Sequence, residues 1–154
     1  MRFSVAAAST ALVALAEARI TGIKVPKEIK LGEAFETIIV RENYIQSVYE
    51  SSIVFGYAAE DAYPGTIGQV ADSFNLGESK SSADKALRKK VTIPQDAPKG
   101  RGLITATLLS IYGASGVPVI SQYNATITFG NKTSDEYVDL RWGLGNSLRI
   151  VRIG

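Results

Sequence analysis

The sequence contains neither cysteine nor histidine. Without cysteine, no disulfide can support a small core, so the fold must be held together by packing alone. Without histidine, the chain cannot carry Ser-His-Asp or Cys-His catalytic groups, His-based zinc sites, or the histidine-copper site of secreted oxidative polysaccharide enzymes. A Walker-type loop and a G-x-G-x-x-G motif are also missing, so nothing supports nucleotide binding. We therefore expect a protein without a cofactor and without enzymatic activity.

Charge of one sign is not concentrated anywhere along the chain. The formal net charge is +2, with 17 basic and 15 acidic residues. The densest basic group, Lys85, Arg88, Lys89 and Lys90, falls in a strand-like run, where a solvated face is the usual explanation. Nucleic-acid binding would need a clustered basic face. We therefore expect no nucleic-acid partner.

The N-terminus has the layout of a secretory signal. The stretch MRFSVAAASTALVALAEA opens with Arg2, continues apolar or small from Phe3 to Ala16, and ends in two overlapping A-x-A sites. It is too short for a membrane span, which needs about 20 apolar residues. Cleavage after Ala18 would leave residues 19–154 as the mature chain.

No second apolar stretch of spanning length follows this signal. The C-terminal LRIVRIG is short and is interrupted by Arg149 and Arg152, so it fits neither a spanning helix nor a GPI signal. We expect a soluble, secreted monomer that does not insert into membranes.

Beyond the signal, apolar residues recur with a period of two, which is typical of half-buried strands. Residues 34–42, 52–58 and 86–93 show this alternation, and their expected core side chains are Phe35, Ile39, Ile53, Phe55, Tyr57, Leu87, Val91 and Ile93. Residues 72–86 are polar and rich in serine, which predicts a long exposed loop, with room for a short helical turn.

Two long strands are predicted over residues 102–112 and 118–129, joined by GASGV as a hairpin. In the second of them Val119, Tyr123, Ala125, Ile127 and Phe129 share the apolar face. Strands at this spacing, separated by Gly and Pro turns, predict an all-β fold: an antiparallel β-sandwich of immunoglobulin-like architecture. The cysteines and the tryptophan typical of immunoglobulin domains are missing, so only the architecture is predicted.

The C-terminal segment allows two interpretations. YVDLRWGL (137–144), a Gly-Asn turn and SLRIVRI together predict a hairpin. It either packs on the sandwich or forms an arm that presents Trp142 to a partner. The expected division is a signal peptide over 1–18, a β-sandwich domain over 19–134, and a C-terminal hairpin or arm over 135–154.

Carboxylates are the remaining basis for an enzyme, because glycoside hydrolases use a pair of them across a cleft. The candidates are Glu33, Glu36, Glu42, Asp61, Asp72, Glu78 and Asp135, but no spacing pairs any two. A calcium site from Asp135, Glu136 and Asp139 lacks the D-x-D-x-D-G pattern. A secreted carbohydrate-binding module acting at a cell wall is the stronger alternative, with the aromatics Tyr44, Tyr49, Tyr63 and Trp142 as its candidates.

Two N-glycan acceptor triplets lie close together, Asn124-Ala125-Thr126 and Asn131-Lys132-Thr133. They are meaningful because the signal sends the chain through the secretory pathway. Alternation places Asn124 on the polar face of its strand, pointing to solvent, and places Asn131 at the exit of that strand. Both are predicted glycosylation sites.

Several segments resemble one family: ENYIQSV (42–48), FGY (55–57), YPGTIG (63–68), SFNLGE (73–78), VTIPQDAPKGRGLITATLLSIYGASG (91–116) and SQYNATITFGN (121–131). They are similar to the necrosis-inducing secreted protein family of fungal effectors, which suppress plant immunity. The likeness covers roughly residues 19–131, and its longest ungapped part is 91–116.

The resemblance implies a non-enzymatic effector that acts in the host apoplast or host cytoplasm. It implies binding to host plant receptor-like kinases, both a leucine-rich-repeat co-receptor and a receptor-like cytoplasmic kinase, with inhibition of the kinases and suppression of pattern-triggered immunity. Host cell death is a further implied outcome. The family provides no catalytic residues to transfer, so the contact residues are inferred from the C-terminal segment, as apolar anchors: Tyr137, Leu140, Trp142, Leu148 and Ile150.

Overall fold

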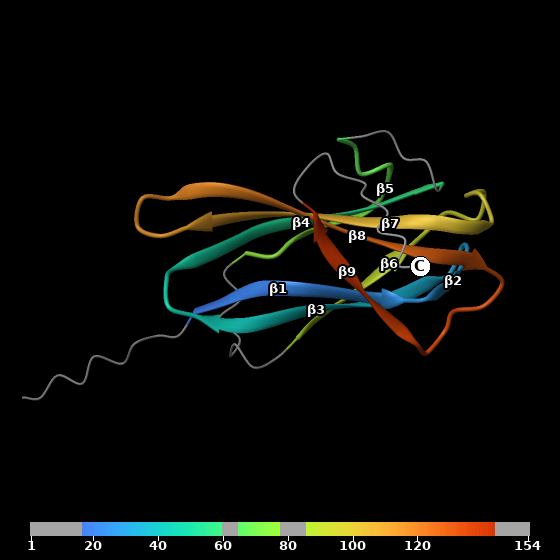
Figure 1. Ribbon diagram of the computed structural model, residues 1–154, viewed down its shortest axis with the longest axis horizontal. Coiled ribbons are helices and arrows are strands. Elements are labelled where there is room, and N and C mark those ends of the chain that lie inside the picture. Colours follow the sequence, from blue (N-terminus) through green and yellow to red (C-terminus); the bar gives the residue numbers. More distant parts are fainter. Residues whose placement is uncertain (1–16, 60–64, 78–85, 144–154) are drawn as a thin grey trace, which may run out of the picture.

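The structure, a computed structural model, describes residues 17–59, 65–77 and 86–143 (Figure 1). Within these ranges every regular element is a β-strand. In chain order the strands are β1 (Glu17–Pro26), β2 (Glu28–Lys30), β3 (Ala34–Tyr44), β4 (Val48–Ala59), β5 (Gln69–Asn75), β6 (Leu87–Thr92), β7 (Gly100–Tyr112), β8 (Val117–Gly130) and β9 (Tyr137–Gly143).

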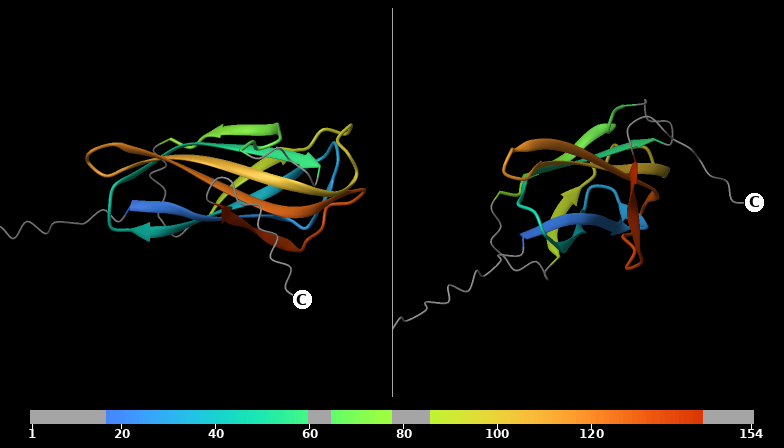
Figure 2. Two further views of the ribbon diagram at one scale, coloured as in Figure 1. Left: turned by 45° about the horizontal axis from the view of Figure 1, so that its top comes forward. Right: turned by 60° about the vertical axis from the view of Figure 1, so that its left-hand side comes forward.

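The strands follow one hydrogen-bonded path, β5-β4-β7-β8-β9-β1-β3-β6, in which all neighbours are antiparallel. The short β2 lies beside this path and pairs in parallel with β8. Two layers face each other, one of β5, β4, β7 and β8 and the other of β1, β3 and β6, with β9 crossing between them (Figures 1 and 2). The prediction of an all-β antiparallel sandwich is confirmed. Its immunoglobulin-like detail stays a prediction.

Alternation along the strands produces the core. In β3 the buried side chains are Phe35, Thr37 and Ile39, while the residues between them are more exposed. The hydroxyl of Thr37 donates to the carbonyl oxygen of Lys89 at 2.9 Å, so this buried polar group is paired. The same alternation buries the predicted core residues Ile53, Phe55 and Tyr57 of β4, Val91 of β6, and Tyr123, Ile127 and Phe129 of β8. The predicted core residues Leu87 and Ala125 are only partly buried, and Val119 is exposed, so its predicted core position is wrong. The largest fully buried side chains are Phe55, Phe129, Ile23, Ile29, Ile39, Ile53, Ile93, Ile104 and Leu108.

The two edges of the path approach each other, so the sandwich is nearly closed. The Lys89 ammonium of β6 lies 5.3 Å from the ring centroid of Phe74 on β5, which is within cation–π range. Phe74 in turn packs edge-on against the core ring Phe55, with centroids 6.2 Å apart. The half-buried Lys89 side chain thus spans the seam between β6 and β5.

Strand β9 is an interior strand of the path. It pairs with β1 through Ile23↔Leu140 and with β8 through Tyr123↔Trp142. Leu140 is buried at 4% exposure. Residues 137–143 therefore help to join the two layers, which corresponds to the packed interpretation of this segment. The predicted return strand of the hairpin lies outside the described residues.

Three strands depart from the sequence expectation. Residues 72–75 belong to β5 and not to a loop, so that part of the 72–86 prediction is wrong, and residues 78–85 lie outside the described chain. Strands β1 and β2 were not predicted. The last two residues of the expected signal peptide, Glu17 and Ala18, stand in β1 opposite Tyr44 and Asn43.

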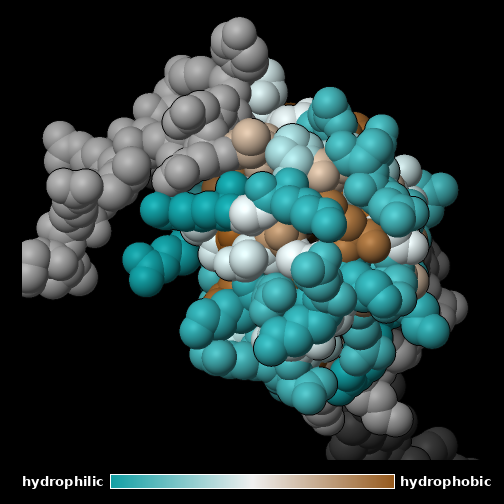
Figure 3. Space-filling model, turned by 90° about the vertical axis from the view of Figure 1, so that its right-hand side faces the viewer, coloured by the Kyte–Doolittle hydropathy of each residue, from teal (hydrophilic) through white to brown (hydrophobic). Residues whose placement is uncertain are grey.

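The two ends of the sandwich differ in chemistry. One end carries β2 and the β6–β7 and β8–β9 connections, and hydrophilic side chains cover most of it, with some apolar residues visible between them (Figure 3). We call this the polar end. The opposite end carries the β3–β4 and β7–β8 turns and the start of β1 (Figure 1). No helix in the described chain is long and apolar enough to cross a membrane.

Candidate functional site: an apolar surface at the hairpin end

The site is built on the tip of the β7–β8 hairpin, which projects at the end of the sandwich (Figure 1). The turn between the two strands is tight and contains Gly113 and Gly116, both with positive φ. Glycine is suited to that backbone conformation because it has no Cβ. The hairpin therefore reverses within four residues and keeps its two strands in register to the tip, at Tyr112↔Val117.

Four consecutive residues after this turn are all exposed and all apolar: Val117, Pro118, Val119 and Ile120. Their exposed fractions include 51% for Val117 and 68% for Ile120. A strand that covers a core on one face should expose only every second side chain. This stretch therefore extends beyond the layer that would cover its inner face, and apolar side chains point to both sides of the strand.

Apolar neighbours widen the outer side of this stretch. The register places Pro118 opposite Ile111 of β7, and Ile111 opposite Tyr49 of β4, so the three lie in one row across the sheet. Ile120 lies opposite Leu109 in the next row. The β3–β4 turn adds Ile45, which is 98% exposed. We call the exposed set Ile45, Tyr49, Val117, Pro118, Val119 and Ile120 the apolar end surface.

The two turns beneath this surface are tied together. The backbone N–H of Gly113 donates to the carbonyl oxygen of Ser47 at 2.8 Å. The rings of Tyr44 and Tyr112 meet edge-on, with centroids 6.1 Å apart, and the Arg19 guanidinium lies 4.4 Å from the Tyr44 centroid. These contacts join β1, β3 and β7, so the apolar end surface rests on three anchored strands.

A buried carboxylate lies below it. Glu50 is only 8% exposed, and its two oxygens accept hydrogen bonds from the hydroxyl of Ser110 and from the backbone N–H of Ile20, the latter at 2.9 Å. A buried carboxylate is tolerated when it is hydrogen-bonded in this way. Since both oxygens are engaged by groups on β7 and β1, Glu50 acts as a structural clamp between the two layers.

Two tyrosines near this carboxylate are harder to ionise than usual. Burial, and then the charge of Glu50, raise the pKa of the Tyr123 phenol above its ordinary value. The same causes in the same order raise the pKa of Tyr112, with Arg19 lowering it in part. Both phenols are therefore neutral at physiological pH, and neither has the lowered pKa that activates a nucleophile.

The carboxylates considered for a hydrolase are not brought together in the described chain. Glu33 pairs with Lys30 and Glu36 with Arg88, while a carboxylate oxygen of Asp72 accepts from the N–H of its neighbour Ser73 at 2.8 Å. Glu42 and Asp135 are exposed, and Asp61 and Glu78 lie outside the described residues. The separate ion pairs are those of a solvated surface.

The acidic residues considered for calcium are likewise held apart by lysines. Lys27 Nζ lies 3.3 Å from Glu136, and Lys24 Nζ lies 3.6 Å from Asp139. Across residues 17–59, 65–77 and 86–143, no three His, Cys, Asp or Glu side chains gather as a metal site would require. These residues instead fasten the β8–β9 connection and β9 to β1.

The four aromatics considered for glycan binding do not form one platform. Tyr44 is engaged by Tyr112 and Arg19, as described above. Tyr49 and Trp142 are exposed at 42% and 57%, but they stand on β4 and β9, strands that are not neighbours in the sheet. Tyr63 lies outside the described residues.

The contact residues predicted in the C-terminal segment differ in exposure where the structure describes them. Leu140 is in the core, and half-buried Tyr137 donates from its hydroxyl to the carbonyl oxygen of Glu36 at 3.3 Å. Of the three members within residues 137–143, Trp142 is the exposed one. Leu148 and Ile150 lie outside the described residues. The fold therefore does not offer Leu140 at the surface, although Leu140 and Trp142 share one face of β9.

Sequence reasoning missed Val117, Pro118 and Ile120 as surface candidates and placed Val119 on the core face. A signal for them existed, since the run VPVI interrupts the alternation that Tyr123, Ala125, Ile127 and Phe129 follow. A run of three or four exposed apolar residues is avoided in soluble proteins unless it serves a function. Recognising it required the knowledge that residues 117–120 are exposed on both faces of the strand.

The two glycan acceptors stand in different settings. Asn124 is half-buried on interior strand β8, opposite Thr105 of β7 and Arg141 of β9, so it points to the outer face but is less open to solvent than alternation alone suggests. Asn131 is exposed directly after β8, at the polar end of the sandwich.

Comparison with known proteins gives one family and two close relatives. A family model described as the Nis1 family matches residues 16–128. Necrosis-inducing secreted protein 1 of Colletotrichum orbiculare is 44% identical over 149 residues, which cover 96% of this chain and 92% of the relative. The protein of the same name from Colletotrichum higginsianum is 46% identical over 138 residues, covering 89% of this chain and 95% of the relative.

Among solved structures, a cohesin module from a Clostridium perfringens family 33 glycoside hydrolase aligns with 77% of this chain and 99% of its own. The sequence identity is 20% and the TM-score is 0.38.

Proposed function

Since this chain belongs to the Nis1 family of secreted proteins, we propose that it is an effector that causes host cell death and suppresses immunity by binding plant receptor kinases. The chain is a secreted protein, and both relatives bear the name necrosis-inducing secreted protein. The proposed targets are a leucine-rich-repeat co-receptor and a receptor-like cytoplasmic kinase. The effector itself performs no chemistry on them.

The observation that carries this proposal is the exposed run Val117–Ile120 on an anchored hairpin. Clustered exposed apolar side chains mark interaction sites in soluble proteins. Their removal from water on binding is favourable by about 25 cal/mol per Å² of apolar area. The surface is also pre-organised, because the Glu50 clamp and the Gly113–Ser47 bond fix the strands below it.

Inhibition follows if the effector binds one kinase conformation better than another. A ligand shifts a conformational equilibrium only by its differential affinity for the two states. An apolar edge that docks on a kinase surface exposed in the inactive state meets that requirement. Occlusion of a surface that substrates need would have the same result, and both routes depend on contact alone.

The test is capture of receptor-kinase cytoplasmic domains by the secreted protein and its variants. Ile120→Asp places a charge on the apolar end surface, at an exposed residue of β8. Val70→Asp is the matched control, because Val70 is 60% exposed against 68% for Ile120 but lies on β5. We expect Ile120→Asp to weaken capture about tenfold or more, since the loss of one interface anchor costs about 1.4 kcal/mol or more. Val70→Asp should bind within about twofold of the wild type.

Several outcomes would decide against the proposal. No capture of any receptor kinase by the wild-type protein would overturn it. Equal loss of capture in both variants would show that the apolar end surface is not the specific binding site. A third variant, Trp142→Ala, tests an exposed residue of β9, and loss in that variant alone would move the site to β9. Retention of the protein on chitin, cellulose or glucan, lost in Tyr49→Ala, would favour the carbohydrate-binding alternative.

A further inference from the structure

We propose that Asn131 is the N-glycosylation site of this protein, that Asn124 is not modified, and that the glycan covers the polar end of the sandwich. Both asparagines satisfy the acceptor pattern, so the sequence alone does not distinguish them. The distinction comes from the surroundings of each side chain in the fold.

Asn131 presents the correct atom to solvent. Its side-chain oxygen Oδ1 accepts a hydrogen bond from the Lys99 ammonium at 3.3 Å. Lysine can only donate, so Oδ1 faces Lys99 and the amide nitrogen Nδ2 faces the other way. An N-glycan is attached through Nδ2. Because Asn131 is exposed, a sugar on this atom extends into solvent while the contact to Lys99 is kept.

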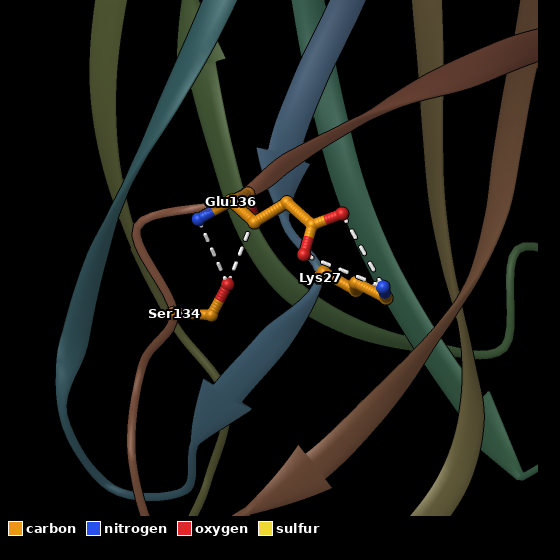
Figure 4. A network of polar contacts seen from close by, with 3 residues as sticks. All are labelled: Lys27, Ser134 and Glu136. Carbon is orange, nitrogen blue, oxygen red and sulfur yellow. Dashed lines mark hydrogen bonds and ion pairs between the residues drawn. The ribbon is translucent and has the colours of Figure 1, made fainter.

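The connection that carries Asn131 is held at several points, so the folded protein does not need to rearrange around a glycan. The hydroxyl oxygen of Thr133 accepts from the N–H of Lys30 at 3.1 Å, and the N–H of Ser134 donates to the carbonyl oxygen of Glu28 at 2.9 Å. Ser134 also bonds through its hydroxyl to the backbone of Glu136, whose carboxylate pairs with Lys27 (Figure 4).

Asn124 sits in a much tighter place. It is half-buried between Thr105 on β7 and Arg141 on β9. Thr105 is only 6% exposed, because residue Ile67 crosses above it and accepts a hydrogen bond from its hydroxyl at 2.7 Å. A glycan on Asn124 would have to leave beside this crossing segment. It would also stand where β8 pairs with β9, a pairing limited to residues 122–124. We infer that folding and glycosylation at Asn124 exclude each other.

The reaction is a group transfer from a lipid-linked oligosaccharide diphosphate. A new bond forms between Asn131 Nδ2 and the anomeric carbon of the first sugar, while the bond from that carbon to the phosphate oxygen breaks. The lipid diphosphate leaves with the bonding electron pair, and Nδ2 gives up one proton. The donor is supplied by the secretory pathway, through which a secreted protein passes.

The position of the glycan separates it from the apolar end surface. Strand β8 runs from Val117 at one end of the sandwich to Gly130 at the other. At about 3.3 Å per residue, Ile120 and Asn131 lie roughly 35 Å apart along the strand direction. The glycan thus adds bulk to the end that is already hydrophilic and leaves the apolar residues accessible.

The test is secretion of the full chain from a fungal host, followed by electrophoresis before and after enzymatic removal of N-glycans. We expect the wild type to lose the mass of one glycan, Asn124→Gln to lose the same mass, and Asn131→Gln to show no change. Thr133→Ser and Thr133→Ala form the matched pair, because both keep Asn131 and only serine preserves the acceptor. Serine also preserves the hydroxyl that accepts from the Lys30 N–H. Glycosylation should therefore persist in Thr133→Ser and be lost in Thr133→Ala.

Three results would overturn the proposal: two glycans on the wild type, loss of the glycan in Asn124→Gln, or no glycan on the wild-type protein. A separate arm compares kinase capture by the glycosylated and the enzymatically deglycosylated protein, and equal capture is expected. Only this arm rests on the proposed function. If no kinase is captured, the mass measurements still decide the glycan site.

Discussion

Glu50 offers the sharpest test of how the hairpin end is held. The substitution Glu50→Ala removes an acceptor that serves the Ser110 hydroxyl and the Ile20 N–H, on two different strands. Both donors belong to buried residues, since Ser110 is 1% exposed and Ile20 is 4% exposed. The variant therefore leaves two donors without their partner inside the sandwich.

The expected cost follows from these contacts. Hydrogen bonds to a charged group contribute about 1.5–3 kcal/mol each, so two of them contribute about 3–6 kcal/mol. Part of this is offset because the buried carboxylate no longer has to be desolvated, a penalty that can amount to several kcal/mol. We expect the free energy of unfolding to fall by about 2–4 kcal/mol. Glu50→Gln keeps one acceptor oxygen and should cost about 1 kcal/mol.

The assay is urea unfolding followed by far-UV circular dichroism. The matched control is Glu33→Ala, which removes a carboxylate whose partner Lys30 is also exposed, and it should change stability by less than about 0.5 kcal/mol. Ser110→Ala completes a double-mutant cycle with Glu50→Ala. We expect a coupling free energy of about 1 kcal/mol or more, because the two residues share one hydrogen bond.

The reasoning is refuted if Glu50→Ala is no less stable than the Glu33→Ala control. Additive effects of Glu50→Ala and Ser110→Ala would refute the contact between them in particular. Kinase capture by Glu50→Ala can be measured at a temperature where the variant is still folded. Weaker capture there would show that the Glu50 clamp contributes to the order of the apolar end surface. Unchanged capture would show that the surface does not depend on it.

Two further predictions concern packing and pH. A Cβ at Gly102 would lie 2.2 Å from the ring of Phe129, so Gly102→Ala should lower the free energy of unfolding by about 1–3 kcal/mol in chemical denaturation. The control is Gly22→Ala, whose added Cβ would have its nearest neighbour at 3.8 Å and should not show this penalty. Equal effects of the two substitutions would contradict the expected clash. Because the pKa values of Tyr112 and Tyr123 are raised in the folded state, the unfolded state releases their protons first as the pH rises, and the stability present below the ordinary tyrosine pKa is lost above about pH 10. The loss should shrink in the double Tyr→Phe variant, as measured by unfolding at pH 8 and pH 11.

The function rests on two different kinds of support. The family and the secreted state come from likeness to proteins of the same name. The apolar end surface comes from the fold and is where we propose that a partner binds. The capture experiment tests the proposed function and the proposed binding surface together. It compares Ile120→Asp with Val70→Asp, two substitutions at residues of similar exposure on different strands. The proposed glycan site at the other end can be tested without any partner.

Much of the fold was accessible from the sequence because burial alternates along most strands. Phe35 and Ile39, and likewise Ile53, Phe55 and Tyr57, were predicted to face inward and are buried. Strand β5 was missed because only the short apolar side chains Val70 and Ala71 and the ring of Phe74 mark it, and polar residues stand on its exposed face. Strand β1 carries the alternating Ile23 and Val25, but it begins at Glu17 and so overlaps the end of the expected signal peptide, and for that reason it was not predicted as a strand.

By itself, the sequence determined the absence of cysteine and histidine chemistry, the strand periodicity and the family resemblance, because each depends on residue type and spacing along one chain. The tertiary structure decided what covers each face. Leu140 and Trp142 alternate identically in the sequence, yet Leu140 is buried opposite Ile23 and Trp142 is exposed where the layers part. Val119 shares the periodicity of Tyr123 but lies beyond the opposing layer. Alternation specifies which side chains share a face, whereas their burial depends on strands brought over that face from distant parts of the chain.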